Sequence, residues 1–186
     1  MAEKSGIRDS IRTQERILAA AQAEFARRGY DGARVDAIVA RARISKNLLY
    51  HYFRGKEELY IRILERTYEM LRRRQSEVPL NGLDPLNAMI RLCENTFRVF
   101  VEEPDMIVML NTENLHRGKH IAKSPIIRAM NDKLSENLRD ILREGEEAGV
   151  FRKGVDPVEL YISISGLGYF YLSNQHTLSL LFKRKL

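Results

Sequence analysis

Apolar residues recur every three or four positions along most of the chain, which is the spacing of one face of an α-helix. In the first such segment, Thr13 can cap a helix that Gly29 ends. The apolar positions of this segment are Ile17, Leu18, Ala21 and Phe25. The same spacing predicts a short helix over residues 35–42. No segment alternates with a period of two for long enough to indicate a strand, so the pattern predicts an all-α protein.

Local start and stop signals place the next two helices. Ser45 can cap a second short helix that runs through Tyr52, and Gly55 breaks it. A long helix then runs to about residue 75. Its first turn carries Glu57 and Glu58, where the helix dipole favours acidic side chains.

Asp-Pro and Ser-Pro pairs mark further helix starts, because a capping residue followed by proline is typical of a helix N-terminus. The helices that follow these pairs are expected near residues 85–102, 125–148 and 157–174, with a less regular one at 105–116. Pro, Asn and Gly cluster at 76–85, which indicates a boundary. The sequence therefore predicts one helical domain over residues 12–72 and a second helical domain over residues 76–186.

Composition narrows the class of protein. Of the 186 residues, 44% are hydrophobic and 30% are charged, so the chain can bury a core and fold in water. The single cysteine, Cys93, excludes an intramolecular disulfide framework and a Cys-rich zinc site. The N-terminus lacks the apolar core of a signal peptide, and a reducing, cytoplasmic location is expected. The uncharged stretch 160–182 is interrupted by SNQHT, which favours burial against protein over a membrane span.

Positive charge is concentrated in the first part of the chain. Residues 1–75 hold 17 Lys and Arg against 10 Asp and Glu, whereas residues 76–186 hold 14 against 15. All of the net charge of +6 therefore belongs to the first part. This asymmetry favours a polyanionic partner for that part, with a solvated basic face as the alternative.

Two short helices joined by a tight turn at Arg43 and Ile44 form a helix-turn-helix packed on the first helix. On the second short helix, Leu49, Tyr52 and Phe53 are expected to face inward. The positions expected to face outward are Ser45, Lys46, Asn47, Leu48, Tyr50 and His51. Since a helix fits the DNA major groove, the polar start of this helix is expected to meet DNA while some of its rings anchor it.

Most of the outward side chains have a chemistry that suits DNA. Lys46 can reach phosphate or guanine acceptors, and Asn47 can pair with an adenine edge. Ser45 and Tyr50 can donate hydrogen bonds to phosphates. Lys56, at the start of the next helix, can pair with a phosphate alongside free backbone N–H groups. Taken singly, each of these residue types also occurs on ordinary protein surfaces.

The elements ILAAA…F…GY, I-x-x-x-A, S-K-x-x-L-Y-H-Y-F and K-E-E-L follow one another in register over residues 13–60. In this order they resemble the DNA-binding domain of the tetracycline-repressor (TetR) family. The resemblance implies a homodimeric transcription regulator, usually a repressor, that binds a double-stranded DNA operator. It also implies a C-terminal domain that takes up a small-molecule effector and releases the protein from that operator.

The chain departs from the family pattern at four positions. Arg34 stands where the family usually has a capping Thr that touches phosphate; arginine keeps the phosphate contact but loses the cap, at a cost of about 1 kcal/mol. Arg43 replaces a turn glycine, and a positive φ there costs roughly 1–2 kcal/mol. Leu48 replaces a common Thr or Ser and suits only an apolar contact, such as a thymine methyl. Gly55 takes a position often held by Ser.

In the second domain, an effector pocket is expected among the helices of residues 85–148. Its candidate residues are Met89, Phe97, Met106, Met109, Leu110 and Met130. The alternative is that these methionines only fill gaps in the core, and it is favoured because Met is a common gap-filling residue in protein cores. His116 and His120 are four residues apart, but Gly118 lies between them and no third ligand is near, so a metal site is disfavoured.

The last two helices of the TetR family pair in a four-helix dimer interface, and the uncharged run at 160–182 resembles one of those helices. The residues expected to pack against a partner are Leu160, Ile164, Leu167, Tyr171 and Leu172. No phosphate loop, G-x-S-x-G or H-E-x-x-H motif is present, so the sequence indicates neither an enzyme nor a cofactor. The competing hypothesis is a helical ligand-binding or oligomerising protein that does not bind DNA.

Overall fold

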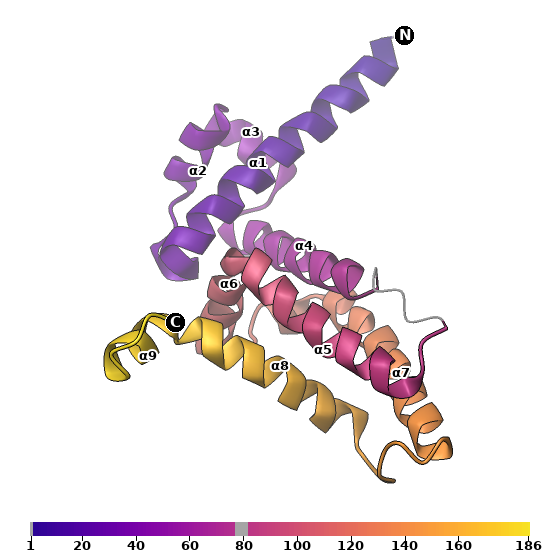
Figure 1. Cartoon of the computed structure of the whole chain (residues 1–186). Coiled ribbons are helices and arrows are strands. Elements are labelled where there is room, and N and C mark those ends of the chain that lie inside the picture. The colour runs from indigo at the N-terminus through magenta and orange to yellow at the C-terminus, as the bar shows by residue number, and fades with distance from the viewer. Residues whose placement is uncertain (1, 77–81) are drawn as a thin grey trace. The chain divides into compact units, whose positions relative to one another are not determined.

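The computed structural model describes residues 2–76 and 82–186, with the side chains of this part except those of residues 2–7, 76 and 131–135. In these ranges every regular element is helical, which confirms the predicted all-α class (Figure 1). None of the described helices is long and apolar enough to cross a membrane. Half of the boundary predicted at 76–85, namely residues 77–81, lies outside the described residues.

The helices group into two compact units. Unit 1 comprises the described residues up to Thr67 together with Val108–Ser124, and unit 2 comprises the described parts of Tyr68–Ile107 and Pro125–Leu186. Helices α4 (Lys56–Ser76) and α6 (Pro104–Leu115) therefore contribute residues to both units. The domain limits at 12–72 and 76–186 stay a prediction, and the units differ from them chiefly in joining residues 108–124 to the first part of the chain.

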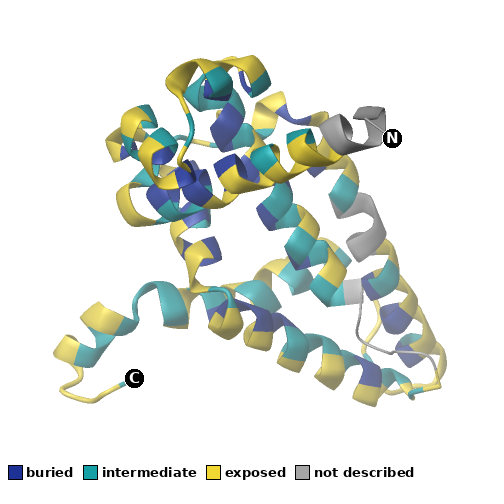
Figure 2. Ribbon diagram, turned by 90° about the horizontal axis from the view of Figure 1, so that it is seen from above, coloured by how far each residue is buried: buried dark blue, intermediate teal, exposed yellow. Residues whose placement is uncertain are grey.

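Unit 1 is built on helix α1 (Ala2–Gly32), on which α2 (Val35–Ala42) packs, and α3 (Lys46–Tyr52) packs on α2. The first turns of α4 meet α1 where the ring of Tyr60 packs on that of Phe25. Its core consists of side chains with no exposed surface, among them Ile17, Phe25, Ile38, Leu49, Leu59 and Ile63. Buried residues lie where these helices face one another and exposed residues lie outside (Figure 2). The three- and four-residue spacing of the apolar positions therefore builds this core as predicted.

The start of α1 differs from the sequence prediction. The helix begins at Ala2 rather than after Thr13, whose hydroxyl donates to the Asp9 carbonyl at 2.8 Å inside the helix and caps nothing. Residues 2–12 contain no proline and include Ala, Glu, Lys and Arg, which are good helix formers. Gly29 breaks the helical geometry with φ 64° and ψ −176°, as expected of a C-terminal glycine, yet a further turn extends to Gly32.

Unit 2 is organised around α5 (Pro85–Glu102), α7 (Pro125–Glu147) and α8 (Pro157–Ser173), which pack on one another, and it ends with α9 (Gln175–Leu181). The predicted Asp-Pro starts are confirmed: Asp84 accepts from the Asn87 N–H at 3.1 Å, and Asp156 accepts from the N–H groups of Val158 and Glu159. Helices α5 and α8 approach closely at Gly168, where an added Cβ would lie 3.2 Å from the Phe97 and Phe100 rings.

Candidate nucleic-acid interface

The turn between α2 and α3 is fixed by backbone bonds and by an arginine from α1. Arg43 ends α2 in the left-handed region, at φ 53° and ψ 51°, as expected from the turn glycine that the resembling family has at this position. The N–H of Ile44 then donates to the Val39 carbonyl at 3.1 Å. Arg16 donates to the carbonyls of Ala42 and Arg43, the latter at 3.1 Å. These bonds set the angle between α2 and α3, and no local pattern in the sequence singles out Arg16.

Helix α3 begins at the predicted cap. Ser45 is extended, and its Oγ accepts from the Leu48 N–H at 3.2 Å. Because a hydroxyl can accept and donate together, the Ser45 O–H stays able to donate to another group. At the other end, the Phe53 N–H donates to the Leu49 carbonyl, which closes the last turn.

One face of α3 is buried and the other is exposed. Leu49 and Phe53 are 0% and 5% exposed, as predicted, whereas the ring of Tyr52 is half-buried at the edge of the unit. The side chains on the outer face are Ser45, Lys46, Asn47, Tyr50 and His51, all exposed, with Leu48 half-buried beside them. A helix anchored on one side and polar on the other can enter a groove without losing its core contacts.

Lys46 already has a partner in the free protein. Its Nζ lies 2.8 Å from Asp36 Oδ1 on α2, and a hydrogen bond from Lys46 to that carboxylate raises the lysine pKa. Both side chains are exposed, so the pair contributes little to stability and Lys46 can exchange Asp36 for a phosphate at low cost.

Lys56 and Arg34 lie at the starts of α4 and α2. Lys56 Nζ donates to the Asp31 carbonyl at 3.2 Å and lies 4.8 Å from the centre of the Tyr30 ring, which ties the start of α4 to the end of α1. Arg34 makes no side-chain cap on α2, as predicted from its replacement of a capping residue, and its side chain is exposed. Its backbone N–H donates instead to the buried Glu24 carboxylate at 3.3 Å.

Comparison with known proteins decides the family. Residues 17–63 match the family described as bacterial regulatory proteins, tetR family, and residues 85–186 match the tetracyclin repressor-like C-terminal domain. This chain belongs to the TetR family. It is therefore a DNA-binding transcriptional regulator, as the sequence predicted, and the alternative of a helical protein that does not bind DNA is set aside.

Named relatives resemble this TetR-family chain over most of its length. The HTH-type transcriptional repressor NicS of Pseudomonas putida is 35% identical over 178 residues, which are 95% of this chain and 84% of NicS. The structure of the putative transcriptional regulator SCO4942 from Streptomyces coelicolor has a TM-score of 0.69 at 30% identity and covers 90% of this chain and 84% of its own. The ketosteroid transcriptional regulator KstR2 of Mycobacterium tuberculosis has a TM-score of 0.66 at 26% identity, with coverage of 87% and 81%.

A buried carboxylate in unit 1 holds the segment that follows α6. Glu113, 2% exposed, accepts from the backbone N–H groups of His120 at 2.7 Å and Ile121 at 3.0 Å. The Nδ1 of His120, fully buried, lies 2.8 Å from the second carboxylate oxygen. The His120 ring also packs on Tyr30 and Tyr60, with ring centres 4.4 and 4.9 Å apart. The TetR helix-turn-helix unit therefore includes α6 side chains that sequence reasoning did not assign to it.

The two histidines considered for a metal are both engaged by carboxylates. His116 Nε2 lies 3.2 Å from Asp31, and His120 Nδ1 pairs with Glu113. In the part of the chain that the structure describes, no group of three metal-ligating side chains comes together. The two histidines thus lie close together, with ring centres 5.4 Å apart, and they pack at and just after the end of α6.

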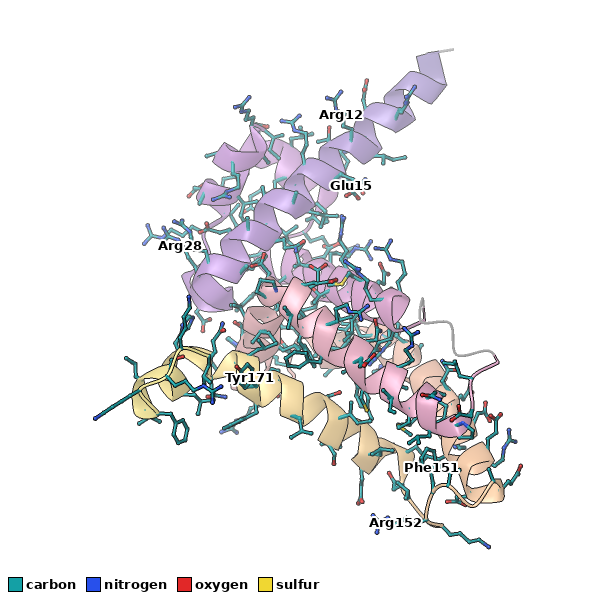
Figure 3. The ribbon with its side chains drawn as sticks, in the orientation of Figure 1. Arg12, Glu15, Arg28, Phe151, Arg152 and Tyr171 are labelled. Carbon is teal, nitrogen blue, oxygen red and sulfur yellow. The ribbon has the colours of Figure 1, made fainter. Side chains whose placement is uncertain are left out.

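The structure distributes the predicted effector residues over both TetR units. Met89, Phe97, Met106 and Met130 belong to unit 2, whereas Met109 and Leu110 belong to unit 1. Met106 and Met109 are buried, while Phe97 is 44% exposed and lies 6.4 Å from the ring of Tyr171, labelled in Figure 3. The pocket stays a prediction.

Proposed function

We propose that this TetR-family regulator is a homodimeric repressor that leaves its operator when a small organic molecule binds unit 2. The main support for DNA recognition by α3 is that its polar face is exposed while Leu49 and Phe53 anchor its other face in the core. Repression is supported by the relatives named repressors, among them NicS and KstR2. In this proposal residues 12–72 bind DNA, and residues 76–186 take up the effector and dimerise.

Within this proposal, the residues divide into base-reading and phosphate-binding roles. Asn47 pairs with a base edge, and Leu48 packs on a thymine methyl. Lys46 exchanges Asp36 for a phosphate or guanine. The remaining phosphate contacts are assigned to Arg34, Ser45, Tyr50, His51 and Lys56. Lys56 is the most constrained of these, since it already bonds to Asp31 and lies over Tyr30.

The dimer is supported by an apolar surface on α8. Val158, Ile162, Leu167 and Phe170 are between 52% and 79% exposed on a helix of 17 residues. Of the residues predicted to meet a partner, Leu167 and Tyr171 are exposed, whereas Leu160, Ile164 and Leu172 are half-buried. An exposed apolar helix face of this kind is typical of a surface that a second subunit covers.

Variants of α3 test the assigned roles on an operator found by genomic binding selection. Lys46→Ala is expected to weaken binding and to lower the salt slope by about 0.9 for the lost phosphate contact. Lys153→Ala, which removes an exposed lysine after α7, is the control for net charge and should change neither. Asn47→Ala should relax base preference at one position of each half-site by roughly 1–3 kcal/mol.

The two variants fail in different ways if the roles are wrong. An unchanged salt slope in Lys46→Ala would contradict the phosphate contact and would mean that Lys46 stays paired with Asp36 when the unsubstituted protein binds DNA. An unchanged sequence preference in Asn47→Ala would remove its base-reading role and leave the DNA-binding activity of the family in place.

A further inference from the structure

A cluster of polar side chains lies in unit 2, contributed by the last turns of α4 and the first half of α8. We call it the Arg72 cluster; its members are Arg72, Gln75, Tyr161 and Ser165. Arg72 donates to Gln75 Oε1 at 2.5 Å and to the Tyr161 hydroxyl at 3.4 Å. The guanidinium carbon also lies 5.8 Å from the centre of the Tyr161 ring. These contacts draw together side chains that are 89 residues apart in sequence.

Besides the guanidinium of Arg72, the cluster contains polar atoms that are buried without a hydrogen-bond partner of full geometry in the described structure. They are the amide nitrogen Nε2 of Gln75 and the hydroxyl Oγ of Ser165. Since the Gln75 oxygen already accepts from Arg72, its two N–H groups are left for another acceptor. Both side chains lie close enough to the Tyr161 hydroxyl to lower its pKa by hydrogen bonding, but neither reaches the geometry of a full hydrogen bond. Because folded proteins rarely leave buried polar groups unpaired, a stronger acceptor beside them would satisfy both.

The Tyr161 hydroxyl lies in the same environment. Burial raises its pKa, but the Arg72 guanidinium and the nearby Ser165 and Gln75 side chains together hold the pKa below its ordinary value. A hydroxyl of lowered pKa is a better hydrogen-bond donor. The Arg72 cluster thus presents one guanidinium, two hydroxyls and an amide, which can all donate hydrogen bonds.

We propose that the Arg72 cluster binds the carboxylate of a small organic acid, and that this acid is the effector of unit 2. The inference rests on the proposed control by a small molecule and adds the chemical class of that molecule. A planar carboxylate has two acceptor oxygens that match the guanidinium fork, and it can accept from Gln75 and Ser165 as well. The sequence does not reveal this site, because the residues of α4 and α8 are brought together only by the fold.

Other occupants fit the donor set less well. A neutral amide brings one acceptor oxygen and its own N–H donors, which would face the donors of Gln75 and Ser165. Inorganic phosphate is a mixture of monoanion and dianion at neutral pH, and its tetrahedral oxygens match the planar guanidinium fork of Arg72 less closely while its dianion exceeds the single charge of that group. Bound water could also satisfy Gln75 and Ser165. If water were the natural occupant, a carboxylate and its amide would have the same effect on the stability of the protein.

The test measures thermal unfolding of the free full-length protein with three carboxylates, namely benzoate, phenylacetate and octanoate. Benzamide and inorganic phosphate serve as the neutral and anionic comparisons. At least one carboxylate is expected to raise the melting temperature, by an amount that grows with the logarithm of its concentration above Kd, with no such rise for benzamide or phosphate. In Gln75→Leu and Ser165→Ala, the apparent Kd of that carboxylate should rise about tenfold or more.

Ser163→Ala is the matched control, because its hydroxyl lies on the exposed side of α8 and bonds to the Glu159 carbonyl. It should bind the carboxylate as the unsubstituted protein does. Ser165→Ala removes only a buried, unpaired hydroxyl, so it is expected to fold even if Gln75→Leu, which also removes the oxygen that accepts from Arg72, does not.

The possible outcomes separate this site from the regulatory proposal. No stabilisation by any of the three carboxylates, or equal stabilisation in the wild type and both cluster variants, would overturn the site. Because the measurement contains no DNA, neither result would touch the roles assigned to α3. Failure of operator binding would, in turn, leave a carboxylate-dependent shift standing as a property of unit 2.

Discussion

Removal of the Glu113 carboxylate is the most direct test of how unit 1 is assembled. In Glu113→Ala, the backbone N–H groups of His120 and Ile121 and the ring Nδ1 of His120 lose their acceptor. His120 is fully buried, so water cannot readily replace the carboxylate at its groups. Each orphaned buried donor costs roughly 1–3 kcal/mol. Truncating one member of a buried pair costs about 3–5 kcal/mol, which is the loss we expect.

Two further variants set the scale of this loss. Glu113→Gln keeps one oxygen that can accept from the backbone, but its amide N–H groups face a donor, so about half of the loss is expected. Glu15→Ala removes an exposed pair with Arg66, 2.8 Å long, and should cost less than about 1 kcal/mol. Glu15 is labelled on α1 in Figure 3.

The assay combines urea unfolding followed by far-UV circular dichroism with amide hydrogen exchange of residues 116–124. Glu113→Ala should lower the free energy of unfolding and speed exchange at residues 120 and 121 first, where the acceptor is lost. A loss below about 1 kcal/mol, with exchange as slow as in the unsubstituted protein, would refute the inference that Glu113 holds this segment to the helix-turn-helix.

Two other predictions concern unit 2. Gly145→Ala would place a Cβ 2.0 Å from Cδ2 and 2.8 Å from Cγ of Phe151, whose ring is labelled in Figure 3. The resulting overpacking, typically 1–3 kcal/mol, should outweigh the gain of about 1 kcal/mol in helix propensity, and Phe151→Ala should remove the penalty in a double-mutant cycle of melting temperatures. Leu167→Glu puts a charge on the exposed apolar face of α8 and should shift the protein toward monomers in sedimentation experiments, whereas Lys153→Glu should not; an unchanged mass would place the dimer contact elsewhere.

The helices of this protein were predictable because their signals are local. Ser45 caps α3 with its own hydroxyl, and Asp84 and Asp156 cap α5 and α8. The left-handed conformation of Arg43 was expected from the family resemblance, in which a glycine usually holds this turn position. Each of these caps needs only residues within four positions of one another, so the sequence alone carries the necessary information.

The missed features depend on contacts that are remote in sequence. Arg16 reaches the α2–α3 turn 26 residues away, and Ser124 donates to Glu65 over 59 residues. Segment 108–124 joins unit 1 because of such contacts and of the buried Glu113. The Thr13 cap failed for the opposite reason: a good capping residue does not end a helix when the residues before it also favour one.

The size of the proposed carboxylate contact can be set against what regulation requires. Lowering operator affinity a hundredfold requires a ligand that distinguishes the two states by about 2.7 kcal/mol. Hydrogen bonds to a charged group contribute about 1.5–3 kcal/mol each, so the Gln75 and Ser165 contacts would suffice if they form in one state only. Arg72 and Lys56 lie on the same helix, 16 residues or about 24 Å apart. A carboxylate held by the Arg72 cluster would therefore bind the last turns of α4, the helix whose first residue, Lys56, bonds to the end of α1 in unit 1. Gln75→Leu should then weaken both carboxylate binding and the carboxylate-dependent release from DNA.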